Sequence, residues 1–162
     1  MTIRLFRQED WGAVSRIYRE GLETRNATFE TEIPDYETWI KKFHAGLLYA
    51  GVVDAHVVAW AGLQPVSARK VYEGVAEVTI YVDASSKGKG VGTALMNYLI
   101  EQSERAGIWS LYAAIFRENA ASIRLHRSTG FREIGYREKI AQLDGVWRDT
   151  ILFERRSKKI GA

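Results

Sequence analysis

The most informative stretch of the sequence is Lys87-Gly88-Lys89-Gly90-Val91-Gly92-Thr93. Its three glycines alternate with other residues, after a predicted strand at residues 75–82 and at the start of a predicted helix at residues 90–106. Glycine lets backbone N–H groups approach an anion without a Cβ in the way. The helix N-terminus adds a partial positive charge, and the two lysines add full charges. The stretch therefore predicts a binding site for phosphate or pyrophosphate within an α/β fold.

Two common nucleotide-binding motifs do not fit this loop. A Walker A loop ends in Gly-Lys-Ser/Thr, whereas Thr93 follows Gly92 directly here. A dinucleotide fingerprint needs a third glycine where Leu95 stands. Two interpretations remain from the residues alone: the loop binds the phosphates of another ligand, or it is a glycine-rich turn that only caps a helix.

Hydrophobic periodicity on both sides of the loop extends the α/β pattern. Apolar runs and alternation predict strands at residues 2–6, 47–53, 57–63, 75–82, 109–116, 131–140 and 147–153. Apolar residues at helical spacing predict helices at residues 8–23, 35–45, 90–106 and 119–129. The predicted fold class is α/β (α+β), a layered sheet of about seven strands flanked by four helices.

Length and composition predict a single domain over residues 1–162. The chain is 46% hydrophobic and has only two prolines, as is typical of a globular protein with its own core. The net charge of +3 suits an anionic ligand but does not single out nucleic acid. The most basic run begins at Arg155 and includes Lys158 and Lys159, and we expect residues 155–162 to be a flexible, solvated tail.

Cysteine and histidine usage excludes several kinds of chemistry. The chain has no cysteine, so we expect no disulfide, thiolate metal site or cysteine nucleophile. Its three histidines, His44, His56 and His126, are scattered and form no His-Glu-x-x-His motif, so we expect no metal. We also expect no nucleic-acid partner, because no basic-aromatic face emerges, and no membrane partner, because charges interrupt the longest apolar stretch. The absence of cysteine is compatible with a cytoplasmic location, which we expect.

A second motif follows the glycine-rich loop by about thirty residues. It reads Glu118-Asn119-Ala120-Ala121-Ser122-Ile123-Arg124-Leu125-His126 and is followed by Thr129-Gly130-Phe131. Together the two motifs resemble the GCN5-related N-acetyltransferase (GNAT) superfamily, and the element order fits over nearly the whole chain. The resemblance implies the GNAT fold, whose mixed sheet is mostly antiparallel, and acetyl-CoA as the cofactor. His126 stands where the superfamily often has tyrosine, and Lys87 where it usually has glutamine or arginine.

A narrower resemblance is to the phosphinothricin and methionine sulfoximine acetyltransferase branch. It is carried by Glu77-Val78-Thr79-Ile80-Tyr81-Val82, by His126 and by Asn26-Ala27-Thr28-Phe29-Glu30. This branch implies transfer of an acetyl group to the amine of a small amino-acid-like substrate, by a homodimer. Two alternatives stay open: a protein acetyltransferase for lysine or N-terminal amines, and an acyl-CoA-binding sensor without catalysis.

Two side chains are candidates for catalysis. Glu77 is an unexpected carboxylate on an otherwise apolar strand, where burial would raise its pKa toward that of a useful base. Its alternative role is that of an exposed strand carboxylate. His126 is a candidate acid for the departing thiolate, or else a half-buried packing residue.

The resemblance also assigns binding residues. Those expected to contact acetyl-CoA are Ile80, Tyr81 and Val82 through their backbones, together with Lys87, Gly88, Lys89, Gly90, Val91, Gly92, Thr93 and Asn119. Those expected to contact the substrate are Phe29, Ser67, Ala68, Arg69, Glu77, Val78 and Thr79, with Arg69 as a bidentate partner for a substrate carboxylate.

Overall fold

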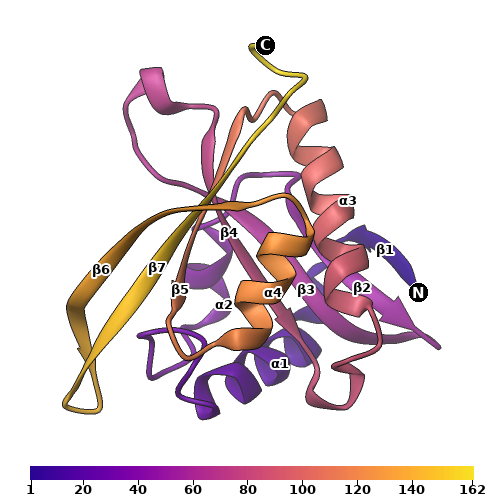
Figure 1. The fold of residues 1–162 in the computed structure, drawn as a ribbon. Helices are drawn as coiled ribbons and strands as arrows, with labels where there is room; N and C mark the ends of the chain where they lie inside the picture. Colours follow the sequence, from indigo (N-terminus) through magenta and orange to yellow (C-terminus); the bar gives the residue numbers. More distant parts are fainter.

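The computed structural model describes all residues, 1–162, and they form one mixed sheet with helices on both faces (Figure 1). The strands are β1 (Thr2–Leu5), β2 (Leu48–Val53), β3 (His56–Pro65), β4 (Val75–Val82), β5 (Ser110–Phe116), β6 (Arg132–Leu143) and β7 (Val146–Arg156). The α-helices are α1 (Trp11–Glu23), α2 (Tyr36–Ile40), α3 (Val91–Arg105) and α4 (Ala120–Ser128). Short 3-10 turns precede α1, β4 and α3, at Gln8–Asp10, Lys70–Tyr72 and Ala84–Ser86. The predicted fold class of seven strands and four helices is confirmed.

The strand order in the sheet is β1-β2-β3-β4-β5-β7-β6. Every neighbouring pair is antiparallel except β4 and β5, which are parallel. A parallel pair needs a long crossover, and α3 supplies it. The one parallel pair therefore lies at the centre of the sheet, with the glycine-rich loop and α3 between its two strands in sequence.

Two hydrophobic clusters fill the space between the sheet and its helices. On one face α3 and α4 pack on the sheet through residues such as Leu95, Leu99 and Ile123. On the other face α1 and α2 bury Val14, Ile17 and Trp39. The alternation along β4 matches this arrangement, because Val78, Ile80 and Val82 belong to the α3 side and Tyr81 to the α1 side. None of the helices is both long enough and apolar enough to span a bilayer.

The helix predicted at residues 35–45 is shorter in the structure and ends at Ile40. Its predicted start is confirmed, since the Asp35 side chain accepts a hydrogen bond from the Thr38 N–H at 2.8 Å. Its predicted end is wrong, because the backbone after Ile40 forms a hydrogen bond with the sheet instead of continuing the helix. The His44 N–H donates to the Leu63 carbonyl on β3 at 2.8 Å, which draws the chain out of the helix and into β2.

The prediction that residues 155–162 form a flexible tail is wrong for the first two of these residues. Arg155 and Arg156 belong to β7 and pair with β5. Beyond the strand, Glu104 on α3 holds the chain: its carboxylate accepts from Arg155 at 3.2 Å and from the Ser157 hydroxyl at 3.0 Å, and it pairs with Lys159 at 3.1 Å. Basic residues near a chain end suggested solvation, but a buried carboxylate on the facing helix gives them partners.

Candidate active site

The central feature of the site is a gap between the two parallel strands. β4 and β5 pair only at Val75–Ser110, Ala76–Leu111 and Glu77–Tyr112, and they separate beyond Glu77. The rest of β4 stays paired with β3, so its opposite edge faces the gap. Unpaired backbone groups at such an edge need partners, which makes the gap a natural site for a ligand with amide groups.

The register of β3 and β4 decides which backbone groups face the gap. The Asp83 N–H donates to the Val58 carbonyl at 2.8 Å, so alternate residues Tyr81, Thr79 and Glu77 also direct their backbone groups toward β3. Ile80 and Val82 direct theirs toward the gap. Of the three backbones expected to bind the cofactor, the structure leaves two available and occupies that of Tyr81.

A cavity of about 880 Å³ fills this gap, lined by β4, the end of β5, α4, the glycine-rich loop and the segment after α1. Its positively and negatively charged lining residues come from different elements. Lys87 and Arg124 come from the glycine-rich loop and α4, while Glu30 and Glu77 come from the segment after α1 and from β4. We call these the basic end and the acidic end of the cavity.

The basic end is built on an α3 N-terminus that lacks a side-chain cap. Gly90 is the N-cap residue and has a left-handed backbone, with φ of 78°. Without a capping side chain, the N–H groups of Val91, Gly92 and Thr93 remain free to bind an anion. By contrast, Asp35 and Asn119 cap α2 and α4 with their own side chains. The residues present at this end fit a pyrophosphate group.

Side-chain contacts from α1 fix the entry to the glycine-rich loop. Arg16 donates to Asp83 at 2.9 Å, and the Glu20 carboxylate accepts from the Ala84 N–H at 3.0 Å. Asp83 also accepts from the Ser85 hydroxyl and N–H, at 2.6 and 2.8 Å. These Ser85 hydrogen bonds, together with Arg16, hold the pKa of Asp83 below its usual range. The loop is therefore anchored on the protein side before any ligand binds.

Glu77 lies where β4 and β5 separate and lines the cavity. It is half-buried, and its carboxylate makes no salt bridge and no side-chain hydrogen bond. Burial raises the pKa of Glu77 above its ordinary value. A partly desolvated carboxylate without a fixed partner can accept a proton from a ligand amine or bind the ammonium form.

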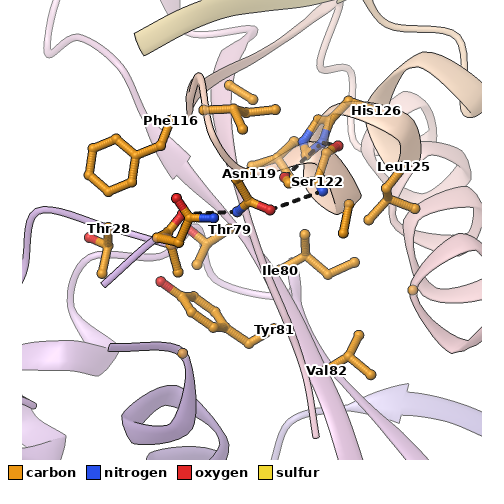
Figure 2. A pocket seen from close by; sticks show the side chains of 18 of the residues that line it. Thr28, Thr79, Ile80, Tyr81, Val82, Phe116, Asn119, Ser122, Leu125 and His126 are labelled. Carbon is orange, nitrogen blue, oxygen red and sulfur yellow. Dashed lines mark hydrogen bonds between the residues drawn. The ribbon is translucent and has the colours of Figure 1, made fainter. Parts of the chain in front are cut away.

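Aromatic and hydroxyl side chains surround the acidic end (Figure 2). Phe29 and Phe116 pack edge to face, with ring centroids 4.6 Å apart. In Figure 2 Thr28 lies just below Phe116, and the Tyr81 ring lies lower still, toward α1. Thr79 accepts from the Gln64 side chain at 3.2 Å. These side chains offer aromatic faces and hydroxyl groups to a ligand bound beside Glu77.

Asn119 joins α4 to the segment after α1. Its side-chain oxygen accepts from the Ser122 N–H at 3.2 Å, and its side-chain nitrogen donates to the Asn26 carbonyl at 3.0 Å (Figure 2). The side chain is thus the N-cap of α4. It also lines the cavity, so a ligand contact remains compatible with both bonds.

His126 is buried, with 3% of its surface exposed. Its Nδ1 lies 2.8 Å from the Ser122 carbonyl, which can only accept, so this nitrogen carries a proton. Burial lowers the pKa of His126, although the Ser122 bond opposes the shift. A neutral ring with its proton on Nδ1 has none on Nε2, which is buried without a partner. These observations favour His126 as a packing residue rather than as an acid in the reaction. Its ring packs edge to face against Phe131, with ring centroids 4.9 Å apart.

From the burial of His126 we predict how the free energy of unfolding changes with pH. The pKa of His126 is lower in the folded than in the unfolded chain, so the unfolded state binds more protons as pH falls below about 6.5. This contribution to stability is present above the unfolded pKa and is lost as pH falls through the folded one. In His126→Phe part of the acid-induced loss of stability should disappear, as measured by urea unfolding at each pH. The exposed His56→Gln should keep the wild-type profile, and identical profiles for all three proteins would contradict the assignment.

Three residues predicted to contact substrate lie elsewhere in the structure. Ser67 and Arg69 line a separate, shallow hollow with Tyr72, Trp109 and other residues, and neither they nor Ala68 line the cavity. The Arg69 guanidinium lies over the Tyr72 ring, 5.3 Å from its centroid. The loop before β4 precedes Glu77 closely in sequence, but β4 carries the chain away from it to the cavity. The structure therefore does not bring these three residues to the cavity that Glu77 lines.

The other predicted site residues are brought together, with one exception. Phe29, Glu77, Val78, Thr79, Asn119 and His126 line the cavity with most of the glycine-rich loop, but Lys89 does not. Sequence reasoning missed Asn26, Thr28, Glu30, Phe116, Ser122, Arg124 and Thr150, which also line it. Arg124 and Ser122 lie within the second motif and on the same helix as Asn119, so helical spacing from Asn119 was a usable signal. No local signal marks Thr150, because only the β5–β7 pairing brings it near.

Comparison with known proteins places these features in a family. A family model described as "Acetyltransferase (GNAT) family" matches residues 11–131, about three quarters of the chain. Among full-length relatives, the Bacillus subtilis (strain 168) protein YwnH is 35% identical over 160 residues, which cover 96% of this chain and 98% of YwnH. YwnH carries a provisional phosphinothricin acetyltransferase name.

Solved structures share the whole architecture. The Sinorhizobium meliloti GNAT superfamily phosphinothricin acetyltransferase in complex with AcCoA matches with a TM-score of 0.90 and 26% identity, over 99% of this chain and 90% of that chain. A ribosomal-protein-alanine N-acetyltransferase from Brucella melitensis matches with a TM-score of 0.90 and 28% identity, over 97% of this chain and 100% of that chain. The same fold therefore occurs in one protein named for a small-molecule acceptor and in another named for a protein acceptor.

Proposed function

Because the chain belongs to the GNAT acetyltransferase family and is an acetyl-CoA-dependent N-acetyltransferase, we propose that its acceptor is the amine of a small amino-acid-like molecule. The observation that carries the proposal is the polarity of the cavity, with Lys87 and Arg124 at one end and Glu77 and Glu30 at the other. The basic end suits the pyrophosphate of the cofactor, and the acidic end suits an ammonium group.

When bound, acetyl-CoA supplies the activated acetyl group and a thiolate leaving group. In the proposed mechanism, the N–H groups of Val91, Gly92 and Thr93 hold the pyrophosphate, and the β4 edge at Ile80 and Val82 pairs with the cofactor arm. An N–H group on this edge would be available to donate to the acetyl carbonyl oxygen of the bound cofactor.

Glu77 prepares the acceptor in this proposal. An amine must be neutral to attack a carbonyl carbon, yet most amines are protonated at pH 7. The Glu77 carboxylate removes that proton directly or through water, and its raised pKa brings it closer to the working pH. We do not assign protonation of the leaving thiolate to His126, because its proton is held by the Ser122 carbonyl.

A protein acceptor is the second candidate. It is favoured by the match to the ribosomal-protein-alanine N-acetyltransferase, which is as good by TM-score as the match to the phosphinothricin enzyme. The small acceptor is favoured by the aromatic side chains of Phe29, Phe116 and Tyr81, which line the same cavity as Glu77. An N-terminal peptide would have to enter this end of the cavity to reach Glu77.

A thiol-release assay with acetyl-CoA separates the candidates. We expect turnover with one or more members of a panel of phosphinothricin, methionine sulfoximine, other amino acids and amino-acid amides. Turnover with alanine-terminated peptides alone would replace the proposed acceptor by a protein. Tight acetyl-CoA binding without turnover on any amine would identify a sensor instead.

We also propose that the protein is a homodimer, as the resemblance implies. Large apolar side chains are exposed on the β6–β7 hairpin, which extends away from the helices in Figure 1: Ile134, Tyr136, Ile140, Val146 and Trp147. Contact with a second copy would cover them. Light scattering after size-exclusion chromatography should give twice the 18.4 kDa chain mass, and Trp147→Glu should shift it toward the monomer.

A further inference from the structure

The segment at residues 24–30 forms one wall of the acidic end but has no regular secondary structure of its own. It contributes Asn26, Thr28, Phe29 and Glu30 to the cavity lining. No helix or strand hydrogen bonds fix it between the end of α1 and the start of α2. Its position relative to Glu77 therefore depends on side-chain contacts from elsewhere in the chain.

Arg148 on β7 supplies two of these contacts, one to a backbone carbonyl and one to a side chain. Its guanidinium donates to the Arg25 carbonyl at 2.8 Å and to the Asn26 side-chain oxygen at 3.1 Å. It also pairs with Glu118 at 3.2 Å and lies over the Phe116 ring, 4.2 Å from the centroid. Only 15% of its side chain is exposed, so solvent screens these interactions less than it would at an open surface.

Asn26 is held from two directions. Arg148 binds its side chain, and Asn119 binds its backbone carbonyl at 3.0 Å. Phe116, which lies under the Arg148 guanidinium, packs in turn against Phe29. One arginine thus links the wall segment to the end of β5 and to the start of α4. The neighbouring Arg25–Asp144 pair is exposed on both sides and should add little.

From these contacts we propose that Arg148 is a positioning residue for acetyl transfer. It holds residues 24–30 against Phe116 and Asn119, and so sets the distance between Phe29, Glu30 and the Glu77 carboxylate. The geometry requires arginine rather than lysine, because the planar guanidinium donates to several acceptors while stacking on a ring. The role in catalysis rests on the proposed function, whereas the effect on the segment does not.

The test compares Arg148→Ala with Arg132→Ala. Arg132 lies on the same hairpin and also pairs with a glutamate, Glu154 at 2.7 Å, but its side chain makes no hydrogen bond to residues 24–30. In Arg148→Ala we expect kcat/KM for the acceptor to fall by about 10- to 100-fold, mainly through a higher acceptor KM. The affinity for acetyl-CoA, measured by calorimetry, should change by less than about twofold. Arg132→Ala should match wild type in both measurements.

A second variant, Asn26→Ala, and a second measurement, hydrogen exchange, test the same contacts independently. Asn26→Ala removes one partner of Arg148 without altering β7, and it should reproduce part of the KM effect. In the double variant the two effects should not add, because they break one network. Hydrogen exchange by mass spectrometry should show faster exchange of residues 24–30 in Arg148→Ala and not in Arg132→Ala.

The outcomes separate the two proposals. An unchanged acceptor KM in Arg148→Ala, or unchanged exchange of residues 24–30, would overturn the positioning role. If no small amine is acetylated by wild type but exchange rises in Arg148→Ala, the segment is held as described and the proposed acceptor is wrong. An equal loss of acetyl-CoA affinity and acceptor affinity would indicate general damage and would also overturn the proposal.

Discussion

Replacement of Glu77 by glutamine should lower the rate of acetyl transfer by about 10²- to 10⁴-fold near pH 7. The variant keeps the size of the side chain but cannot accept a proton. Since the pKa of Glu77 is raised by burial, its carboxylate is a better base than an exposed glutamate and loses activity as pH falls through that raised value. In the variant, the deficit should shrink as pH rises toward the pKa of the acceptor amine, because solvent then supplies the neutral amine.

Measurement of kcat and KM from pH 6 to 10 separates a base from a binding group. If Glu77 only attracts the ammonium ion, Glu77→Gln should raise KM and leave kcat nearly unchanged at saturating substrate. The control is Glu73→Gln, which lies just before β4 and outside the cavity, and which should behave as wild type. A Glu77→Gln protein with wild-type kinetics at every pH would remove Glu77 from the site.

The second large effect concerns the cofactor. Gly90→Asp should reduce acetyl-CoA affinity by about 100-fold or more, because it places a carboxylate beside the uncapped α3 N-terminus, where the pyrophosphate is expected to bind. Nothing lies within 4 Å of a Cβ at this position, so no packing clash confuses the result.

Gly107 provides the matched control for this variant. It has φ of 83°, close to the 78° of Gly90, and a Cβ added there would also meet open space. It follows the C-terminal end of α3 and does not line the cavity. Gly107→Asp therefore carries the same backbone strain and the same charge away from the site. Calorimetric titration of both folded proteins should show weak binding only for Gly90→Asp, and equal affinities would contradict the pyrophosphate site.

The parts of the fold that the sequence predicted are those with a local cause. The glycine-rich loop and the strand at residues 75–82 depend on backbone freedom and on the period of the side chains. The errors arose where distant partners decide. Glu104 orders the chain end through Arg155, and β3 ends α2 early by binding His44.

The same distinction applies to the candidate site. Glu77 and Asn119 could be found because their residue types are unusual or characteristic at their positions. Arg148 could not, since it matters only because β7 pairs with β5 beside Phe116 and the segment after α1 folds against it. Arg69 was assigned to the substrate for its chemistry alone, and the structure places it in a different hollow.

The most direct test of the account follows the acetyl group itself. Acetyl-CoA labelled with ¹³C in the acetyl carbonyl is incubated with the protein and a ¹⁵N-labelled amino acid from the panel that supports thiol release. We expect a ¹³C–¹⁵N coupled amide signal on the small molecule, growing in step with free thiol in wild type and nearly absent in Glu77→Gln. Label that stays in acetyl-CoA, or that appears only on protein or peptide amines, would contradict it.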